Sequence, residues 1–319
     1  MSRVSSSGDP RAPSRPNDGT GESSVRVDAD ETTVGHRPDR WLGWALVALA
    51  LGVATNSLLG PLVTGAIAYP FPETLVNQTV GLEAVSLAVV APWSLVAAWF
   101  VLRDHRAGPV LALPPAAYTA YMFVQYVVGP EYLTYSWVVA FHLGLFVLSG
   151  AVLVRAWSSV RSASLPTPSE TRRRRASVGL VLLTAFVGLQ YLPAAGGVLT
   201  GGPVSDEVAA APTMYWSIAL LDLGVVVPVT VATAIGLLRG ASWAERALYG
   251  VAGWYLLVPV SVAAMGLTML ANGDPNASVG QVVVLSVAAL LFTAFAAWVY
   301  RPLFARARDR QGTTERTTG

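Results

Sequence analysis

Long apolar runs separated by short polar segments fill the chain from residue 41 to residue 302. An α-helix rises about 1.5 Å per residue, so about 20 apolar residues are needed to cross the hydrocarbon core of a bilayer. Eight segments meet this requirement, at 41–63, 80–102, 107–128, 137–156, 177–199, 213–238, 247–271 and 281–302. Backbone polar groups in lipid must be satisfied within the chain, so the pattern predicts an all-α bundle of eight transmembrane helices.

The positions of the basic residues predict how this bundle is oriented. The chain contains no lysine, and its 21 basic residues are arginines in the N-terminal segment, in three of the connections and at the C-terminal end. The other four connections, at 64–79, 129–136, 200–212 and 272–280, contain no arginine. Positively charged connections stay in the cytoplasm, so we expect both termini on that side of the cell membrane.

Composition divides the chain into five segments. Residues 1–40 are rich in Ser, Pro, Gly and Asp, and such a sequence cannot bury enough apolar surface to order itself. We therefore expect a disordered cytoplasmic tail at 1–40 and a second cytoplasmic tail at 303–319. Between them we expect a first four-helix half at 41–156, an arginine-rich cytoplasmic linker at 157–176 and a second four-helix half at 177–302.

The two halves share features that suggest an internal repeat. The stretch Leu46–Gly65 is similar to Leu182–Gly201. In the next helix of each half, a proline precedes an arginine by eleven residues, at Pro92 and at Pro228. Four helices per half would give both halves the same orientation, which is a parallel repeat of the kind found in some transporters. The alternative is that two apolar segments resemble each other by shared transmembrane composition.

Two acidic residues, Glu83 and Asp222, lie well inside predicted spans. An ionisable side chain at the centre of a bilayer costs about 2.5–3.5 kcal/mol on insertion scales, so it normally faces the bundle interior and has a partner. One hypothesis is that these acids bind a proton or a cation. The other is that each carboxyl is a hydrogen-bond anchor between helices.

Further polar side chains lie at a similar depth, in the outer halves of the spans. The third helix has Tyr118, Tyr121 and Gln125 on one face, at helical spacing. These groups predict a polar pocket in the outer half of the membrane. Its predicted binding residues are Glu83, Asp222, Tyr121, Gln125, His142, Gln190 and Tyr191.

Composition excludes several kinds of chemistry. Only 13% of the residues are charged, against about 25% in a typical soluble domain, and cysteine is absent. His142 is the single histidine inside a predicted span, which argues against a haem with two histidine ligands and a multi-histidine metal site. Without lysine there is no retinal Schiff base. We expect no metal, no cofactor and no nucleic-acid partner.

The block Arg172–Arg175 is the densest positive charge in the chain. On a cytoplasmic surface it could bind anionic lipid headgroups, at about 1 kcal/mol per charge. The alternative is a purely topogenic role, in which the block fixes the orientation of the helix that follows.

Two stretches carry a resemblance to a known group of proteins. They are Val80–Leu87, which reads VGLEAVSL, and Leu221–Pro228, which reads LDLGVVVP. They resemble segments of uncharacterised multi-span membrane proteins from archaea and high-GC bacteria, in which a tyrosine-rich helix follows the first segment. The resemblance implies an integral membrane protein marked by two acids, at Glu83 and Asp222, and implies no substrate. Leu82 departs from the pattern, which has a polar residue there.

Together these features favour a transport-type protein that binds a proton or a cation in the outer half of the membrane. A structural or partner-binding membrane protein is the first alternative, because polar groups also lock helices together. An intramembrane enzyme that modifies lipids is the second, and the lack of an obvious nucleophile–base set argues against it.

Overall fold

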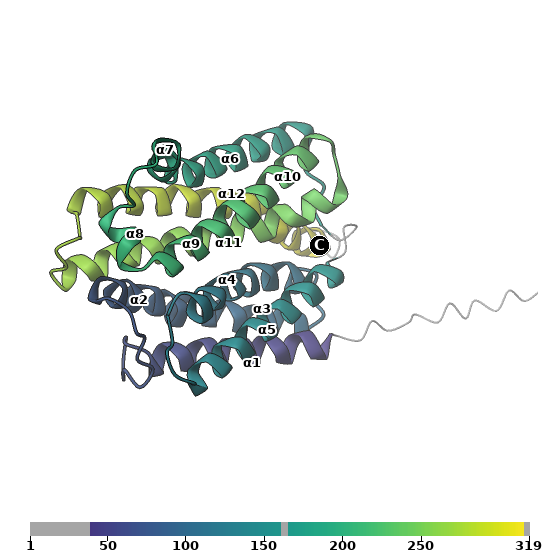
Figure 1. Ribbon diagram of the computed structural model, residues 1–319. Coiled ribbons are helices and arrows are strands. Elements are labelled where there is room, and N and C mark those ends of the chain that lie inside the picture. The colour runs from purple at the N-terminus through teal and green to yellow at the C-terminus, as the bar shows by residue number, and fades with distance from the viewer. Residues whose placement is uncertain (1–38, 161–164, 316–319) are drawn as a thin grey trace, which may run out of the picture. The chain divides into compact units, whose positions relative to one another are not determined.

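A computed structural model describes residues 39–160 and 165–315, and the regular structure in these ranges is entirely helical (Figure 1). The predicted all-α class is confirmed for this part of the chain. The predicted tail at 1–40 lies outside the described residues up to residue 38. Residues 161–164 of the predicted linker and 316–319 of the C-terminal tail also lie outside them.

The first half contains five helices. Their bounds are α1 (Arg40–Leu59), α2 (Glu73–Val85), α3 (Ala91–Leu102), α4 (Gly108–Val128) and α5 (Trp137–Ser159). Side-chain caps set two of the starts: the Asp39 carboxylate accepts the Leu42 N–H at 3.2 Å, and the Ser136 hydroxyl accepts the Val138 N–H at 3.2 Å. Such caps satisfy backbone donors that a helix start leaves without partners.

The second half is more broken. Its helices are α6 (Glu170–Leu189), α7 (Leu192–Thr200), α8 (Asp206–Ala210), α9 (Pro212–Leu221), α10 (Val227–Leu238), α11 (Ser242–Ala271) and α12 (Val279–Glu315). The axes of α6 and α7 differ by 47°. Pro193 accounts for the break, because it has no N–H to donate to the carbonyl of Leu189.

Within the described ranges, six helical segments are long and apolar enough to cross a membrane, or seven if the bent pair α6–α7 is one span. The predicted number of eight is not reached, because the prolines, tyrosines and glutamine of α4 keep it outside this set. Most residues of α4 are buried, and it packs against α3, α5, α9 and α11. A helix that neighbouring helices shield from lipid does not need an apolar surface all round.

Large apolar side chains are exposed along the middle of the other spans, for example Leu51, Val96, Val147, Leu182 and Leu290. An apolar surface of this extent would be unfavourable in water and is what a bilayer requires. The protein is therefore a multi-pass membrane protein.

The aromatic residues near the predicted membrane interfaces behave in two ways. Trp41, Trp44, Tyr135 and Trp137 are exposed, as residues of an interfacial belt should be. Tyr69 also lies near a predicted interface, but it is 7% exposed and points into the bundle.

Arginine contacts gather at one end of the bundle, which we call the arginine end. Arg155 pairs with Asp39 at 2.7 Å, and Arg173 pairs with Glu245 at 3.3 Å. Arg172 donates to the carbonyl of Trp298 and stacks on its indole ring. Pro302 lacks the N–H that would otherwise reach this carbonyl within the helix, so the arginine replaces a missing helix hydrogen bond.

The opposite end of the bundle is held together around Asp274. Its carboxylate accepts hydrogen bonds from the Asn77 amide at 2.9 Å, the Thr74 hydroxyl at 3.3 Å and the backbone N–H of Asn276 at 2.9 Å. These bonds join the start of α2 to the connection between α11 and α12. They lower the pKa of Asp274, chiefly through the Asn77 amide.

Figure 1 shows α1 to α5 on one side of the bundle and α6 to α12 on the other. The halves meet where α2 and α4 pack against α11, and α4 against α9. Each half widens into one π-helical turn just before its proline, at Ser86–Val90 before Pro92 and at Asp222–Val226 before Pro228. A proline ring clashes with the carbonyl four residues earlier, and a wider turn relieves that clash.

Left-handed backbone conformations also occur at matching places. Gly65 and Gly201 follow the first span of each half, with φ of 64° and 63°. Asp104 and Gly240 follow the second span, with φ of 51° and 69°. The offset along the chain is the same for both pairs and for the two π-helical turns.

Candidate functional site

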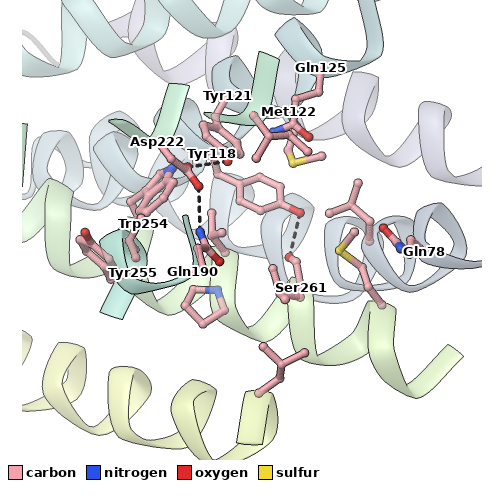
Figure 2. A pocket seen from close by; sticks show the side chains of 18 of the residues that line it. Gln78, Tyr118, Tyr121, Met122, Gln125, Gln190, Asp222, Trp254, Tyr255 and Ser261 are labelled. Atoms are coloured by element: carbon pink, nitrogen blue, oxygen red, sulfur yellow. Dashed lines mark hydrogen bonds between the residues drawn. The ribbon is translucent and has the colours of Figure 1, made fainter. Parts of the chain in front are cut away.

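A cavity of about 190 Å³ lies between the two halves, in the helix parts farther from the arginine end. We call it the Asp222 cavity (Figure 2). Segments of α2, α4, α6, α9, α11 and α12 line it. A cavity of about 150 Å³ in another protein holds benzene, so this space suffices for a small organic molecule.

Among the described residues, Asp222 is the one acid that lines this cavity, and it is 5% exposed. The Tyr121 hydroxyl donates to its Oδ1 at 2.7 Å and the Tyr191 hydroxyl to its Oδ2 at 2.7 Å. The Gln190 amide donates to Oδ2 at 3.2 Å. The donors come from α4 and from the break between α6 and α7, so the carboxyl joins three segments of the chain.

In the part of the chain that the structure covers, no arginine balances this carboxylate. The two ion pairs found there, Arg155 with Asp39 and Arg173 with Glu245, both lie at the arginine end. A buried carboxylate needs hydrogen bonds or a positive partner to offset its lost hydration. Asp222 has the hydrogen bonds and, within residues 39–160 and 165–315, lacks the positive partner.

Aromatic rings form most of the wall near Asp222. Tyr121 lies edge-to-face with Trp254 at 5.4 Å between ring centroids, and Trp254 with Tyr255 at 5.1 Å. Tyr255 continues to Phe292 at 5.9 Å, and Phe292 to Phe186 at 5.3 Å. All five rings line the cavity. We call this row the aromatic arc.

A second polar group lies in the same cavity. Figure 2 shows the Tyr118 hydroxyl beside Ser261, with an oxygen–oxygen distance of 2.9 Å. Ser86 lies 3.2 Å from the same hydroxyl and is the first residue of the first-half π-helical turn. Neither Ser86 nor Ser261 is predicted from the sequence, because serines are frequent in membrane helices and neither residue carries a charge.

Glu83 lies outside this cavity, in a group that we call the Glu83 cluster: Glu83, Leu62, Tyr69, Asn56 and His142. Glu83 is fully buried. Its Oε2 accepts the Leu62 N–H at 3.1 Å, and its Oε1 accepts the Tyr69 hydroxyl at 3.3 Å. Gly60 makes room for the carboxylate, which a β-carbon at that position would overlap. Glu83 thus fastens the loop between α1 and α2.

The rest of the Glu83 cluster connects α1 and α5. The Asn56 side-chain oxygen lies 2.8 Å from His142 Nε2 and 3.4 Å from the Tyr69 hydroxyl. The Tyr126 ring stacks on Tyr69 at 5.0 Å and on His142 at 5.3 Å, and Tyr126 also lines the Asp222 cavity. The Tyr126 ring therefore lies between the cluster and the cavity.

The structure brings together five of the seven predicted binding residues. Tyr121, Gln125, Gln190 and Asp222 line one cavity, and Tyr191 binds the Asp222 carboxylate. Glu83 and His142 were predicted to line the same pocket, but they do not line this cavity and belong to the Glu83 cluster. Tyr69, which donates to Glu83 and stacks on His142, comes from a loop whose folding the helix pattern does not indicate.

The predicted lipid-headgroup block divides into two pairs. Arg172 donates to the Trp298 carbonyl, and Arg173 pairs with Glu245. Arg174 and Arg175 are exposed on the first turns of α6. A headgroup site would therefore rest on the second pair.

Comparison of the chain with protein-family profiles, with curated proteins and with solved structures found no match. The fold and the site define a multi-pass membrane protein with buried polar residues, several of which, Asp222 among them, line a cavity between its two halves. The inference of function rests on this geometry.

Proposed function

We propose that the protein is of the transport type and binds a proton or a cation at Asp222. One observation carries the proposal: a buried carboxylate with three neutral donors, and no positive partner among the described residues, lines a cavity large enough for a ligand. Intramembrane acids that face a cavity commonly mark ion or substrate pathways. A proton or a cation would supply the missing charge.

We further propose that α4 also spans the membrane and completes eight spans, arranged as two parallel repeats of four. Support comes from the constant offset that relates Gly65 to Gly201, and Asp104 to Gly240, and from the matching π-helical turns. In transporters built from repeats, the binding site lies where the repeats meet. The Asp222 cavity is lined from both halves, as this arrangement requires.

For the Glu83 cluster a structural role is the better proposal. Glu83 is bonded to a loop of its own half and does not line the cavity. The cluster would hold the connection between α1 and α2 in place. It supplies a matched control for Asp222, since both are single buried acids.

Charge displacement on a solid-supported membrane tests the proposal. The full chain would be reconstituted in liposomes and exposed to steps in pH and in sodium concentration. We expect a displacement current that Asp222→Asn abolishes and Glu83→Gln retains. An unchanged current in folded Asp222→Asn protein would refute a binding role for Asp222.

A further inference from the structure

We infer that the cation bound at Asp222 is a small organic ammonium ion with an apolar body, about the size of benzylammonium. This inference rests on the proposed function and narrows its ligand to one chemical class. Four observations support it: the acceptor position left on the Asp222 carboxylate, the largely aromatic and apolar walls, the volume of the cavity and a neighbouring apolar groove.

The carboxylate has capacity left for one donor. Two carboxylate oxygens offer about four acceptor positions, and Tyr121, Tyr191 and Gln190 fill three of them. Oδ2 has two donors, whereas Oδ1 has only Tyr121 among the described residues. An ammonium N–H would complete the set at Oδ1 and bring the positive charge that the site lacks.

The walls suit an organic cation better than a hard metal ion. Calcium takes six to eight oxygen ligands and magnesium takes six. Most of the cavity wall is instead aromatic or apolar, and it includes the aromatic arc and the side chains of Met122, Met214 and Met265. In the part of the chain that the structure describes, no three His, Asp or Glu side chains are grouped to hold a metal. Aromatic rings attract ammonium groups through their negative faces.

The volume sets the size of the ligand. The cavity encloses about 190 Å³, which exceeds the roughly 150 Å³ that accommodates benzene in another protein. One ring with a short aminomethyl group fits this space. A ligand with two fused rings and a side chain would extend beyond this space.

A second, apolar groove of about 340 Å³ adjoins the cavity on the side of α4, α5, α10 and α11. Tyr121 and Trp254 line both spaces, so this edge-to-face pair forms the partition between them. An amphipathic amine partitions into a bilayer and could reach Asp222 through this groove. A hydrated metal ion could not use such a route.

Binding of benzylammonium to the full chain in lipid nanodiscs tests the inference, with benzyl alcohol as the neutral probe of the same shape. Both would be titrated calorimetrically at pH 7, with empty nanodiscs subtracted. We expect benzylammonium to bind at least tenfold more tightly than the alcohol, and Asp222→Asn to remove that preference. The double variant Asp222→Asn/Gln190→Glu returns a carboxylate to a neighbouring position and should restore part of it.

Equal binding of the two probes, or no binding of benzylammonium to the wild-type chain, would overturn the inference. The wild-type comparison decides this even if the variants fail to fold. Charge displacement by protons or sodium that depends on Asp222 would then leave the proposed function standing. If that current is absent as well, both proposals fail.

Discussion

The Glu83 cluster and the Asp222 cavity each contain one buried acid on the second span of its half, yet the two acids have different surroundings. Glu83 takes its donors from the loop that it fastens, and it does not line the Asp222 cavity. Asp222 takes its donors from other helices and lines a cavity between the halves. The comparison teaches that the space around a buried acid, more than its depth, separates the structural role that we propose for Glu83 from the binding role that we propose for Asp222.

The backbone explains the difference. Asp222 is the first residue of its π-helical turn, and the first-half turn begins with Ser86. Glu83 precedes that turn and faces the loop. Ser86, which contacts the cavity residue Tyr118, is therefore the positional counterpart of Asp222. π-Helical turns often occur at functional sites, and here each one directs a polar side chain toward the space between the halves.

The largest expected effect comes from filling the space beside Glu83. In Gly60→Ala the new β-carbon would displace the carboxylate from the Leu62 N–H and the Tyr69 hydroxyl. A buried carboxylate without its partners costs about 2–3 kcal/mol, to be measured as a lowered free energy of unfolding. Gly144→Ala is the control, because no atom of the described residues lies near its added β-carbon.

A double variant sharpens that result. Glu83→Ala removes the carboxylate with which the β-carbon introduced by Gly60→Ala would collide. The two changes should therefore couple strongly and cost less together than the sum of their separate costs. Strictly additive costs in unfolding free energy would mean that the β-carbon at position 60 does not collide with the Glu83 carboxylate.

A smaller effect is expected from removing single hydroxyl groups. Tyr69→Phe keeps the ring stack on Tyr126 and loses the donor to Glu83, which should cost about 1.5 kcal/mol of unfolding free energy and leave charge displacement intact. Tyr121→Phe loses the donor to Asp222 and should weaken cation binding as well. Tyr135→Phe, at a fully exposed position, should change neither. A changed current in Tyr69→Phe would contradict a purely structural role for the Glu83 cluster.

The sequence predicts where the helices lie along the chain better than it predicts which side chains meet in space. The bounds of α4 and α5 match the expected segments closely. The shared face of Tyr118, Tyr121 and Gln125 is confirmed, since helical spacing alone fixes it. The separation of Glu83 from Asp222 depends on how a loop folds inward, and no periodicity in the chain reports that.

The smallest expected effect concerns Asp274, an acid outside the spans. Its pH dependence must be distinguished from that of the buried acids Glu83 and Asp222. Its hydrogen bonds hold its pKa below the ordinary value, so its contribution to stability is full above that ordinary pKa. The contribution is lost as pH falls through the lowered pKa. Asp274→Asn should remove this acid dependence and about 1 kcal/mol of unfolding free energy, measured by unfolding at acid and neutral pH. An unchanged acid dependence in Asp274→Asn would mean that another group causes it.

Infrared difference spectroscopy of the reconstituted protein across a pH step gives the most direct test of the binding role proposed for Asp222, because it detects the carboxyl groups that change state. We expect a carboxyl band that is lost in Asp222→Asn and retained in Glu83→Gln. A band that survives in Asp222→Asn and disappears in Glu83→Gln would contradict it and would place the responsive acid in the Glu83 cluster.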